Sequence, residues 1–146
     1  KAFSTLNPTT RKTYLSEDTQ ILLSDTVGFI TDLPKDLISS FRATLEEIGQ
    51  SDVLIHVVDA NDDNYEEKIS SVENTLDIAG LQYTKKIIVF NKIDLIQIDK
   101  KEILKKMFPK QCISSHTSEG LFDLKKYIDQ EIKEIDFYSD KISASQ

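Results

Sequence analysis

Short runs of apolar residues along the chain have the length and composition of β-strands. Val53–Val58 and Ile87–Phe90 are almost continuously apolar and rich in β-branched residues, which is the pattern of strands covered on both faces. Thr13–Leu15 and Ile21–Ser24 are shorter, and the polar residues between them predict a hairpin. Cys112–Ile113 marks a further, shorter strand.

Between the strands, apolar residues recur at intervals of three and four, which is the period of an amphipathic helix. The first helical pattern consists of Leu37, Ile38, Phe41, Leu45 and Ile48, and the second of Ile69, Val72, Leu76 and Ala79. The third consists of Ile103, Leu104, Met107 and Phe108, and the fourth of Leu121, Leu124, Ile128, Ile132 and Ile135. Gly49 and Gly80 end the first two patterns. Asp99 is a candidate cap for the third, which Pro109 ends. This alternation predicts an α/β fold: a doubly wound, mostly parallel sheet with one antiparallel edge hairpin.

The composition excludes several classes of protein. With 146 residues, 39% hydrophobic and 29% charged, the chain is globular rather than disordered. No stretch approaches about 18 consecutive apolar residues, so no membrane partner is expected. The net charge of −7 argues against a grip on nucleic-acid backbones, and direct DNA binding is not expected. The single Cys112 fits a reducing compartment and excludes a disulfide framework.

The glycine positions exclude one more kind of site. All four glycines lie more than 20 residues apart, so this chain holds no glycine-rich phosphate loop. The chain begins at Lys1 without a methionine or a targeting pattern, and we expect it to be cut from something longer.

Candidate chemistry lies after the strands, because ligands of parallel α/β sheets bind at the carboxyl ends of the strands. Asp25-Thr26-Val27-Gly28 follows the second strand. An acidic residue there can hold Mg²⁺ through water, and a glycine lets its N–H approach a phosphate. Taken alone, this pattern favours an ordinary turn.

Asn91-Lys92-Ile93-Asp94 follows the Ile87–Phe90 strand. A carboxylate in the plane of guanine accepts hydrogen bonds from the ring N–H and the exocyclic amine, a donor pair that adenine lacks. Asn91 would brace neighbouring loops and the Lys92 stem would cover a face of the ring. The alternative is a helix cap after a strand. Ser114-Ser115-His116 follows the next strand, where a backbone N–H could bond the guanine carbonyl oxygen.

In this order, the three motifs resemble the third, fourth and fifth motifs of translation-factor GTPases. Longer strings resemble the HflX family. Phe3-Ser4-Thr5-Leu6-Asn7-Pro8-Thr9-Thr10-Arg11 is similar to its first switch, and the run from Asp25 through Phe29, Leu33-Pro34 and Phe41 to Thr44-Leu45-Glu46-Glu47 is similar to its second switch and following helix. The resemblance continues through Val57-Val58-Asp59-Ala60. It implies a P-loop GTPase fold and covers residues 1–135 as a partial G domain, followed by a polar C-terminal tail, 136–146, that frays.

The resemblance also implies roles for individual residues. Thr5 and Asp25 would hold Mg²⁺, the latter through water. The GTP-binding residues would be Phe3, Ser4, Thr5, Leu6, Asn7, Asp25, Thr26, Val27, Gly28, Asn91, Lys92, Ile93, Asp94, Ser114, Ser115 and His116. Phe29 stands where Ras-like enzymes hold a water-orienting Gln, so no catalytic residue is certain, and slow hydrolysis stimulated by a partner is implied. Asn7 and Ser115 depart from the family pattern of Asp and Ala, but neither side chain has a required role.

The function implied is that of a GTP-binding, slowly GTP-hydrolysing cytoplasmic protein that binds the large ribosomal subunit and helps to split or rescue ribosomes. The phosphate loop, its Lys, its Mg²⁺-binding Ser or Thr and the strand before them would precede Lys1, so we expect this chain alone to be inactive. One alternative is a non-catalytic scaffold from a truncated gene. Another is a tRNA-modification GTPase of the TrmE type, against which the Phe29 to Leu33-Pro34 string argues.

Other chemistry-bearing residues have plainer interpretations. His56 lies in a predicted strand and is expected to be a core or strand-edge imidazole rather than a catalytic one. Asp59, Asp62 and Asp63 lack the glycine and distal Glu of a calcium loop and are expected to form a solvated turn. The pairs Lys100-Lys101 and Lys105-Lys106 are expected on a solvated helix face, with an RNA contact as the alternative.

Overall fold

The computed structural model describes residues 10–25, 36 and 42–144, which fall into two compact units. The first unit holds the described residues up to Thr13, those from Leu22 to His56, and Asp62–Ile87. The second holds Tyr14–Ile21, Val57–Asn61 and the described residues from Ile88 onward. The candidate guanine-reading loops lie in the second unit.

The predicted hairpin is confirmed. Strands β1 (Thr10–Tyr14) and β2 (Gln20–Ser24) form a two-stranded sheet. The N–H of Leu15 donates to the carbonyl of Thr19 at 2.9 Å and closes the turn between them. The first strand begins at Thr10 rather than at Thr13, because the polar residues 10–12 pair with β2 although they carry no apolar signal.

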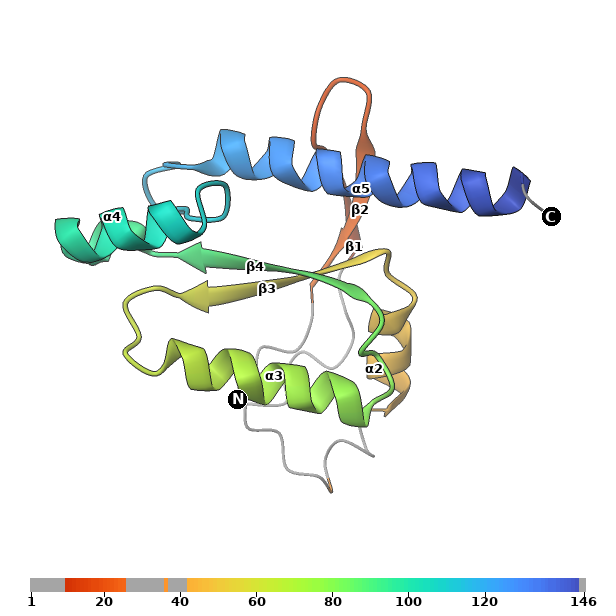
Figure 1. The fold of residues 1–146 in the computed structure, drawn as a ribbon, viewed down its shortest axis with the longest axis horizontal. Helices are drawn as coiled ribbons and strands as arrows, with labels where there is room; N and C mark the ends of the chain where they lie inside the picture. The colour runs from red at the N-terminus through yellow and green to blue at the C-terminus, as the bar shows by residue number, and fades with distance from the viewer. Residues whose placement is uncertain (1–9, 26–35, 37–41, 145–146) are drawn as a thin grey trace. The chain divides into compact units, whose positions relative to one another are not determined.

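Strands β3 (Val53–Asp59) and β4 (Lys85–Asn91) form the parallel sheet and point in the same direction (Figure 1). The strand predicted at Cys112–Ile113 is reduced to one parallel bridge between Phe90 and Cys112. Two hydrogen bonds make that bridge: Phe90 N–H to the Gln111 carbonyl at 2.8 Å and Ile113 N–H to the Phe90 carbonyl at 2.7 Å. The chain is therefore α/β, with a parallel sheet and an antiparallel hairpin, as predicted.

Two helices belong to the first unit, α2 (Arg42–Gly49) and α3 (Tyr65–Ile78). Their predicted apolar faces are buried at Leu45, Ile48, Val72 and Leu76. Leu37, Ile38 and Phe41 of the first helical pattern lie outside the described residues. After α3, Gly80 adopts φ +81°, a left-handed conformation that costs glycine little, and the chain turns away from the helix there.

The second unit holds η1 (Ile93–Leu95), α4 (Ile98–Met107) and α5 (Leu121–Ala144). Its core is made by Val58, Ala60, Val89, Phe90, Ile93, Leu104, Cys112, Ile113, Leu124 and Ile128. The rings of Phe90 and Phe108 lie with their centroids 4.7 Å apart, which joins β4 to the end of α4. Burial raises the pKa of the Cys112 thiol, which packs as a small apolar side chain.

Three details of these helices differ from the sequence predictions. Gln97 precedes α4 in an extended conformation, so Asp99 lies inside the first turn and is not the cap. Ile103 and Met107 are 62% and 64% exposed, so the predicted apolar face of α4 is only partly buried. Helix α5 continues to Ala144, past the end predicted at Ile135. Residues 136–144 contain no glycine or proline to end it.

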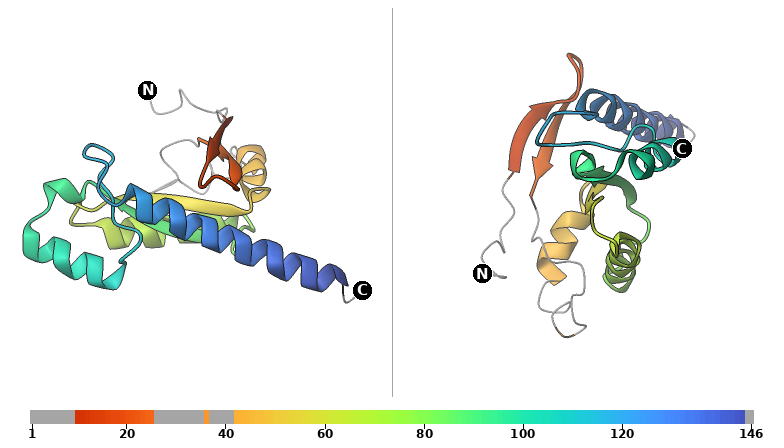
Figure 2. Two further views of the ribbon diagram at one scale, coloured as in Figure 1. Left: turned by 90° about the horizontal axis from the view of Figure 1, so that it is seen from above. Right: turned by 90° about the vertical axis from the view of Figure 1, so that its left-hand side faces the viewer.

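The turn of the hairpin is attached to α5 within the second unit (Figure 2). Thr19 Oγ1 donates to Asp129 Oδ1 at 2.5 Å, and Lys133 Nζ donates to Asp129 Oδ2 at 3.2 Å. The pKa of Asp129 is lowered, and the hydrogen bond from Thr19 is the largest cause. This carboxylate is nearly buried and is satisfied by both partners.

Candidate functional site

Asn91, the last residue of β4, holds two loops of the second unit together. Its side-chain Oδ1 accepts hydrogen bonds from the backbone N–H of Lys92 at 2.8 Å and of Ser115 at 3.0 Å. Its Nδ2 donates to Ser115 Oγ at 3.2 Å. One amide therefore uses its acceptor and a donor to fix the loop after β4 against the loop after Cys112, which is the bracing contact expected from the sequence.

Lys92 begins the turn that follows β4. Its φ is +67°, a left-handed conformation uncommon for a residue with a side chain and seen most often at sites with a special role. Its Nζ lies 3.1 Å from Asp59 Oδ2 at the end of β3. The sequence predicted that Asp59 would be part of a solvated turn and missed this ion pair. The ion pair could have been predicted from the positions of Asp59 and Lys92 at the ends of consecutive parallel strands.

Asp94 is oriented by Ser114. Ser114 is 0% exposed, and its Oγ donates to Asp94 Oδ1 at 2.8 Å while accepting from the Thr117 N–H at 3.1 Å. Ile93 N–H also donates to the Ile113 carbonyl at 3.2 Å, so the two loops are joined by backbone as well as side chains. Asp94 itself is exposed, so its carboxylate is fixed in direction and open to a ligand.

The end of the second loop requires a glycine. Gly120 has φ +79°, and a Cβ at this position would lie 2.1 Å from the Cys112 carbonyl oxygen. Ser118 also has a positive φ, +70°. The loop from Ser114 to Gly120 is therefore tight, and its last residue packs against the backbone at the Phe90–Cys112 bridge.

Most of the other predicted site residues do not belong to the part of the chain that the structure describes. Phe3–Asn7, Thr26–Gly28 and Phe29 lie outside the described residues. Asp25 directly follows β2 and is exposed, and its carboxylate is a ligand type that suits Mg²⁺. Among the described side chains, no group of three or more His, Cys, Asp or Glu residues is arranged to hold a metal ion. His116 is exposed, next to Ser115 in the second loop.

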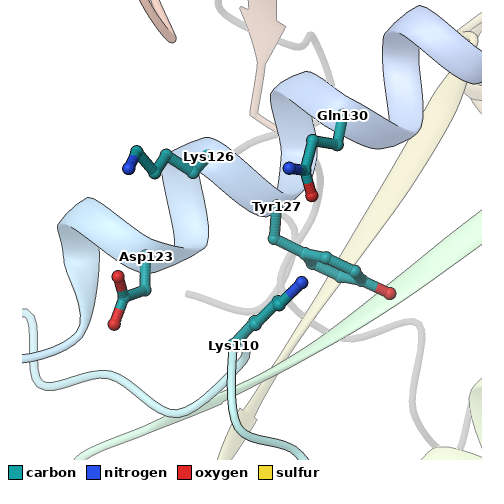
Figure 3. Close-up of a pocket in the computed structure, with 5 residues that line it drawn as sticks. All are labelled: Lys110, Asp123, Lys126, Tyr127 and Gln130. Atoms are coloured by element: carbon teal, nitrogen blue, oxygen red, sulfur yellow. The ribbon is translucent and has the colours of Figure 1, made fainter.

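A hollow of about 250 Å³ occurs elsewhere in the second unit, lined by Lys110, Asp123, Lys126, Tyr127 and Gln130 (Figure 3). The Lys110 ammonium lies 5.9 Å from the centre of the Tyr127 ring, and Lys126 lies 4.8 Å from that of Phe122. No residue predicted to bind a nucleotide lines this hollow. The candidate site is thus an open set of loops at the end of β4, not this depression.

Comparison with known proteins agrees with these motifs. The sequence model of the family described as 50S ribosome-binding GTPase matches residues 1–92. The chain is 40% identical over 144 residues to GTPase HflX of Lacrimispora saccharolytica, an alignment that covers 97% of this chain and 34% of that protein. It is 47% identical over 98 residues to GTPase HflX of Caldanaerobacter subterraneus (67% and 23%), and 40% identical over 95 residues to GTPase HflX of Escherichia coli (65% and 22%).

The chain therefore belongs to the 50S ribosome-binding GTPase family, and its resemblance to HflX GTPases is confirmed. Its α/β architecture is consistent with part of a P-loop GTPase domain. The chain spans between about a fifth and a third of the length of these curated relatives. None of the helices in the described part of the chain combines the length and apolar character needed to cross a membrane.

Proposed function

We propose that this chain supplies the guanine-reading part of a GTP-binding, GTP-hydrolysing protein. The observation that carries the proposal is the network Asn91–Ser115 and Ser114–Asp94, which joins two loops and orients one exposed carboxylate. Such a network is expected where a side chain must meet a planar ligand in one direction. The family match reaches Lys92, and the alignment with a GTPase HflX that covers 97% of this chain extends over both loops, which supports the same interpretation of the motif.

Asp94 is the residue that would select guanine. Its carboxylate accepts hydrogen bonds from the ring N–H and the exocyclic amine of guanine, and adenine cannot supply both donors. The N–H groups of Ser114, Ser115, Thr117, Ser118 and Glu119 already donate within the described loops. From Ser114 to Glu119, the His116 N–H is the one for which the described contacts give no acceptor, and we propose that it donates to the guanine carbonyl oxygen.

The phosphate side of the site would be completed by the other predicted residues. Asp25 and Thr5 would hold Mg²⁺, which neutralises phosphate charge during hydrolysis. Thr26–Gly28 would sense the γ-phosphate, and the chain holds no glycine-rich loop to bind the other phosphates. We therefore propose that this chain alone is not competent for hydrolysis and binds no GDP at micromolar concentration.

The rate of hydrolysis and the role at the ribosome are proposed from the family. The whole protein would hydrolyse GTP slowly, since Phe29 has no hydrogen-bonding group to orient a water. It would act in the cytoplasm on the large ribosomal subunit, splitting or rescuing ribosomes. Support comes from the family description, 50S ribosome-binding GTPase, and from the HflX names of the relatives.

The test of guanine reading uses this 146-residue chain, labelled with ¹⁵N and titrated with GMP and with AMP at millimolar concentration. GMP is expected to shift the amide signals of Asp94, Ser115 and His116, and AMP is expected to leave them in place. The variant Asp94→Asn, which keeps the size of the side chain, should lose the response to GMP. Equal responses to GMP and AMP in the unsubstituted chain would overturn the proposal.

A further inference from the structure

Glu119 ties the loop that follows Cys112 to helix α4. Its Oε1 accepts a hydrogen bond from Lys101 Nζ at 2.8 Å, and its Oε2 accepts one from Lys105 Nζ at 2.7 Å. The two lysines are four residues apart, so they lie one above the other on the same face of α4. Both oxygens of one carboxylate are therefore used to attach the loop to the helix.

This contact corrects the sequence interpretation for one lysine of each pair, whereas Lys100 and Lys106 are exposed, as predicted. Lys101 and Lys105 were expected on a solvated face, but their side chains are only 26% and 42% exposed and both bind Glu119. The hydrogen bonds from Lys101 and then Lys105 lower the pKa of Glu119, so this carboxylate stays charged at neutral pH. The sequence offered no sign of the pairing, because Glu119 follows the lysines across a loop.

The backbone of Glu119 continues the connection toward the candidate site. Its carbonyl accepts a hydrogen bond from the Ser114 N–H at 2.9 Å, which closes the loop on itself. Ser114 in turn donates its hydroxyl to Asp94 Oδ1 at 2.8 Å. A continuous set of contacts thus runs from α4 through Glu119 and Ser114 to the carboxylate of Asp94.

We infer that Glu119 is a positioning residue for guanine recognition. By attaching the loop to Lys101 and Lys105, it keeps Ser114 where its hydroxyl orients Asp94. Glu119 itself touches no ligand in this arrangement and acts only through Ser114. The inference rests on the proposed function, because it takes Asp94 to be the residue that reads guanine.

The first test measures the loop without any nucleotide. In the 146-residue chain, Glu119→Gln keeps the size of the side chain and removes its charge. Amide hydrogen exchange followed by NMR should become about threefold to tenfold faster at Ser114 and Ser118, since two partly exposed ion pairs are weakened. The matched control is Asp62→Asn, which weakens the exposed ion pair with Lys68 in the first unit and should leave these two amides unchanged.

A charge reversal separates the ion pairs from any other effect of changing Glu119. Glu119→Lys alone should speed exchange further, because it places three ammonium groups together. Combining it with Lys101→Glu and Lys105→Glu restores opposite charges and should slow exchange at Ser114 again. Exchange that is unchanged in Glu119→Gln, or not recovered in the triple variant, would overturn the positioning role.

The second test measures recognition. Glu119→Gln should raise the Kd for GMP about threefold to tenfold and, like the parent chain, should not respond to AMP. The control Asp62→Asn should bind GMP as the parent chain does. If the parent chain prefers GMP and Glu119→Gln binds it equally well, the positioning role fails and the proposed function stands. If the parent chain shows no preference for GMP, both fail.

Discussion

The loops after the neighbouring strands β3 and β4 are both acidic and polar, but they are built in different ways. After β3, the side chains of Asp59 and Asp62 accept from the N–H groups of Asn61 and Asn64, each two residues further on. After β4, Asn91 and Asp94 bond to residues 24 and 20 positions away. The backbone contacts after β3 form local turns, to which the Asp59–Lys92 ion pair adds a contact with the turn after β4, whereas the hydrogen bonds of Asn91 and Asp94 fix one loop against another.

This difference indicates where recognition is to be sought. A local Asx turn satisfies the backbone whatever the rest of the chain does, so it says little about a ligand. Hydrogen bonds between residues far apart in sequence cost more chain entropy to form. After β4, these long-range hydrogen bonds converge on the exposed carboxylate of Asp94, which suits a role in binding a ligand.

The largest expected effect comes from Gly120, which ends the loop after Cys112, when it is compared with Gly80, which follows α3. Gly120→Ala brings a Cβ to 2.1 Å from the Cys112 carbonyl oxygen, whereas at Gly80, with a similar positive φ of +81°, a Cβ meets nothing within 4 Å. Gly80→Ala should therefore cost only the left-handed conformation, about 1–2 kcal/mol. Gly120→Ala should cost more than about 3 kcal/mol. Urea unfolding of the two variants measures the difference, and equal losses would contradict the tight packing at Gly120.

A smaller effect is expected from removing the amide of Asn91. Asn91→Ala leaves the Ser115 N–H without its partner and should lower the free energy of unfolding by about 1–3 kcal/mol, and it should abolish the response to GMP. Asn61→Ala, in the loop after β3, should change stability by less than about 0.5 kcal/mol, because its contact with the described residues is made by its backbone N–H, which the substitution keeps. Urea unfolding with GMP titration checks both. Similar losses for the two variants would mean that the two loops are not built differently.

The smallest effect is a dependence on pH from the first unit. Burial lowers the pKa of His56 on β3, and Glu73 opposes the shift only in part. The pKa of His56 in the folded chain therefore lies below its value in the unfolded chain, about 6.5. The contribution of His56 to stability is complete above about pH 6.5 and is lost as the pH falls toward the pKa of the folded chain. The chain should therefore be less stable at pH 5.5 than at pH 7.5, and His56→Gln should flatten this difference. The carboxylates with lowered pKa, Asp62, Glu119 and Asp129, lose their contribution only below about pH 4.

The sequence predicted elements whose signal is continuous and local. Val53–Val58 and Ile87–Phe90 are almost continuously apolar, and both are strands in the structure, but Val57 is 58% exposed, so the prediction that the first is covered on both faces is wrong. The strand predicted at Cys112–Ile113 is a single bridge in the structure, because Cys112 pairs with Phe90 and the chain then turns toward Ser114. The end of α5 was missed, because a polar composition was taken for fraying although residues 136–144 contain no glycine or proline to end the helix.

In the candidate site, the sequence identified the residue types but not the contacts between them. Asn91 was expected to brace loops because its amide both donates and accepts, and the structure contains those bonds. The pair Lys92–Asp59 was missed although both residues stand at the ends of consecutive parallel strands, whereas nothing in the period or spacing of the sequence indicates the pair Lys101–Glu119. Roles in binding nucleotide remain predictions for every residue of the site.

The most direct test of guanine reading exchanges the base preference. Xanthine carries a carbonyl where guanine carries its amine, so Asp94→Asn, which presents an amide donor and an acceptor, suits xanthine where the carboxylate suits guanine. NMR titration of the 146-residue chain and of this variant with GMP and XMP measures both preferences. The account predicts that the parent chain prefers GMP and the variant prefers XMP. A variant that loses GMP without gaining XMP, while its other amide signals stay unchanged, would contradict the assignment of Asp94 as the residue that reads the base.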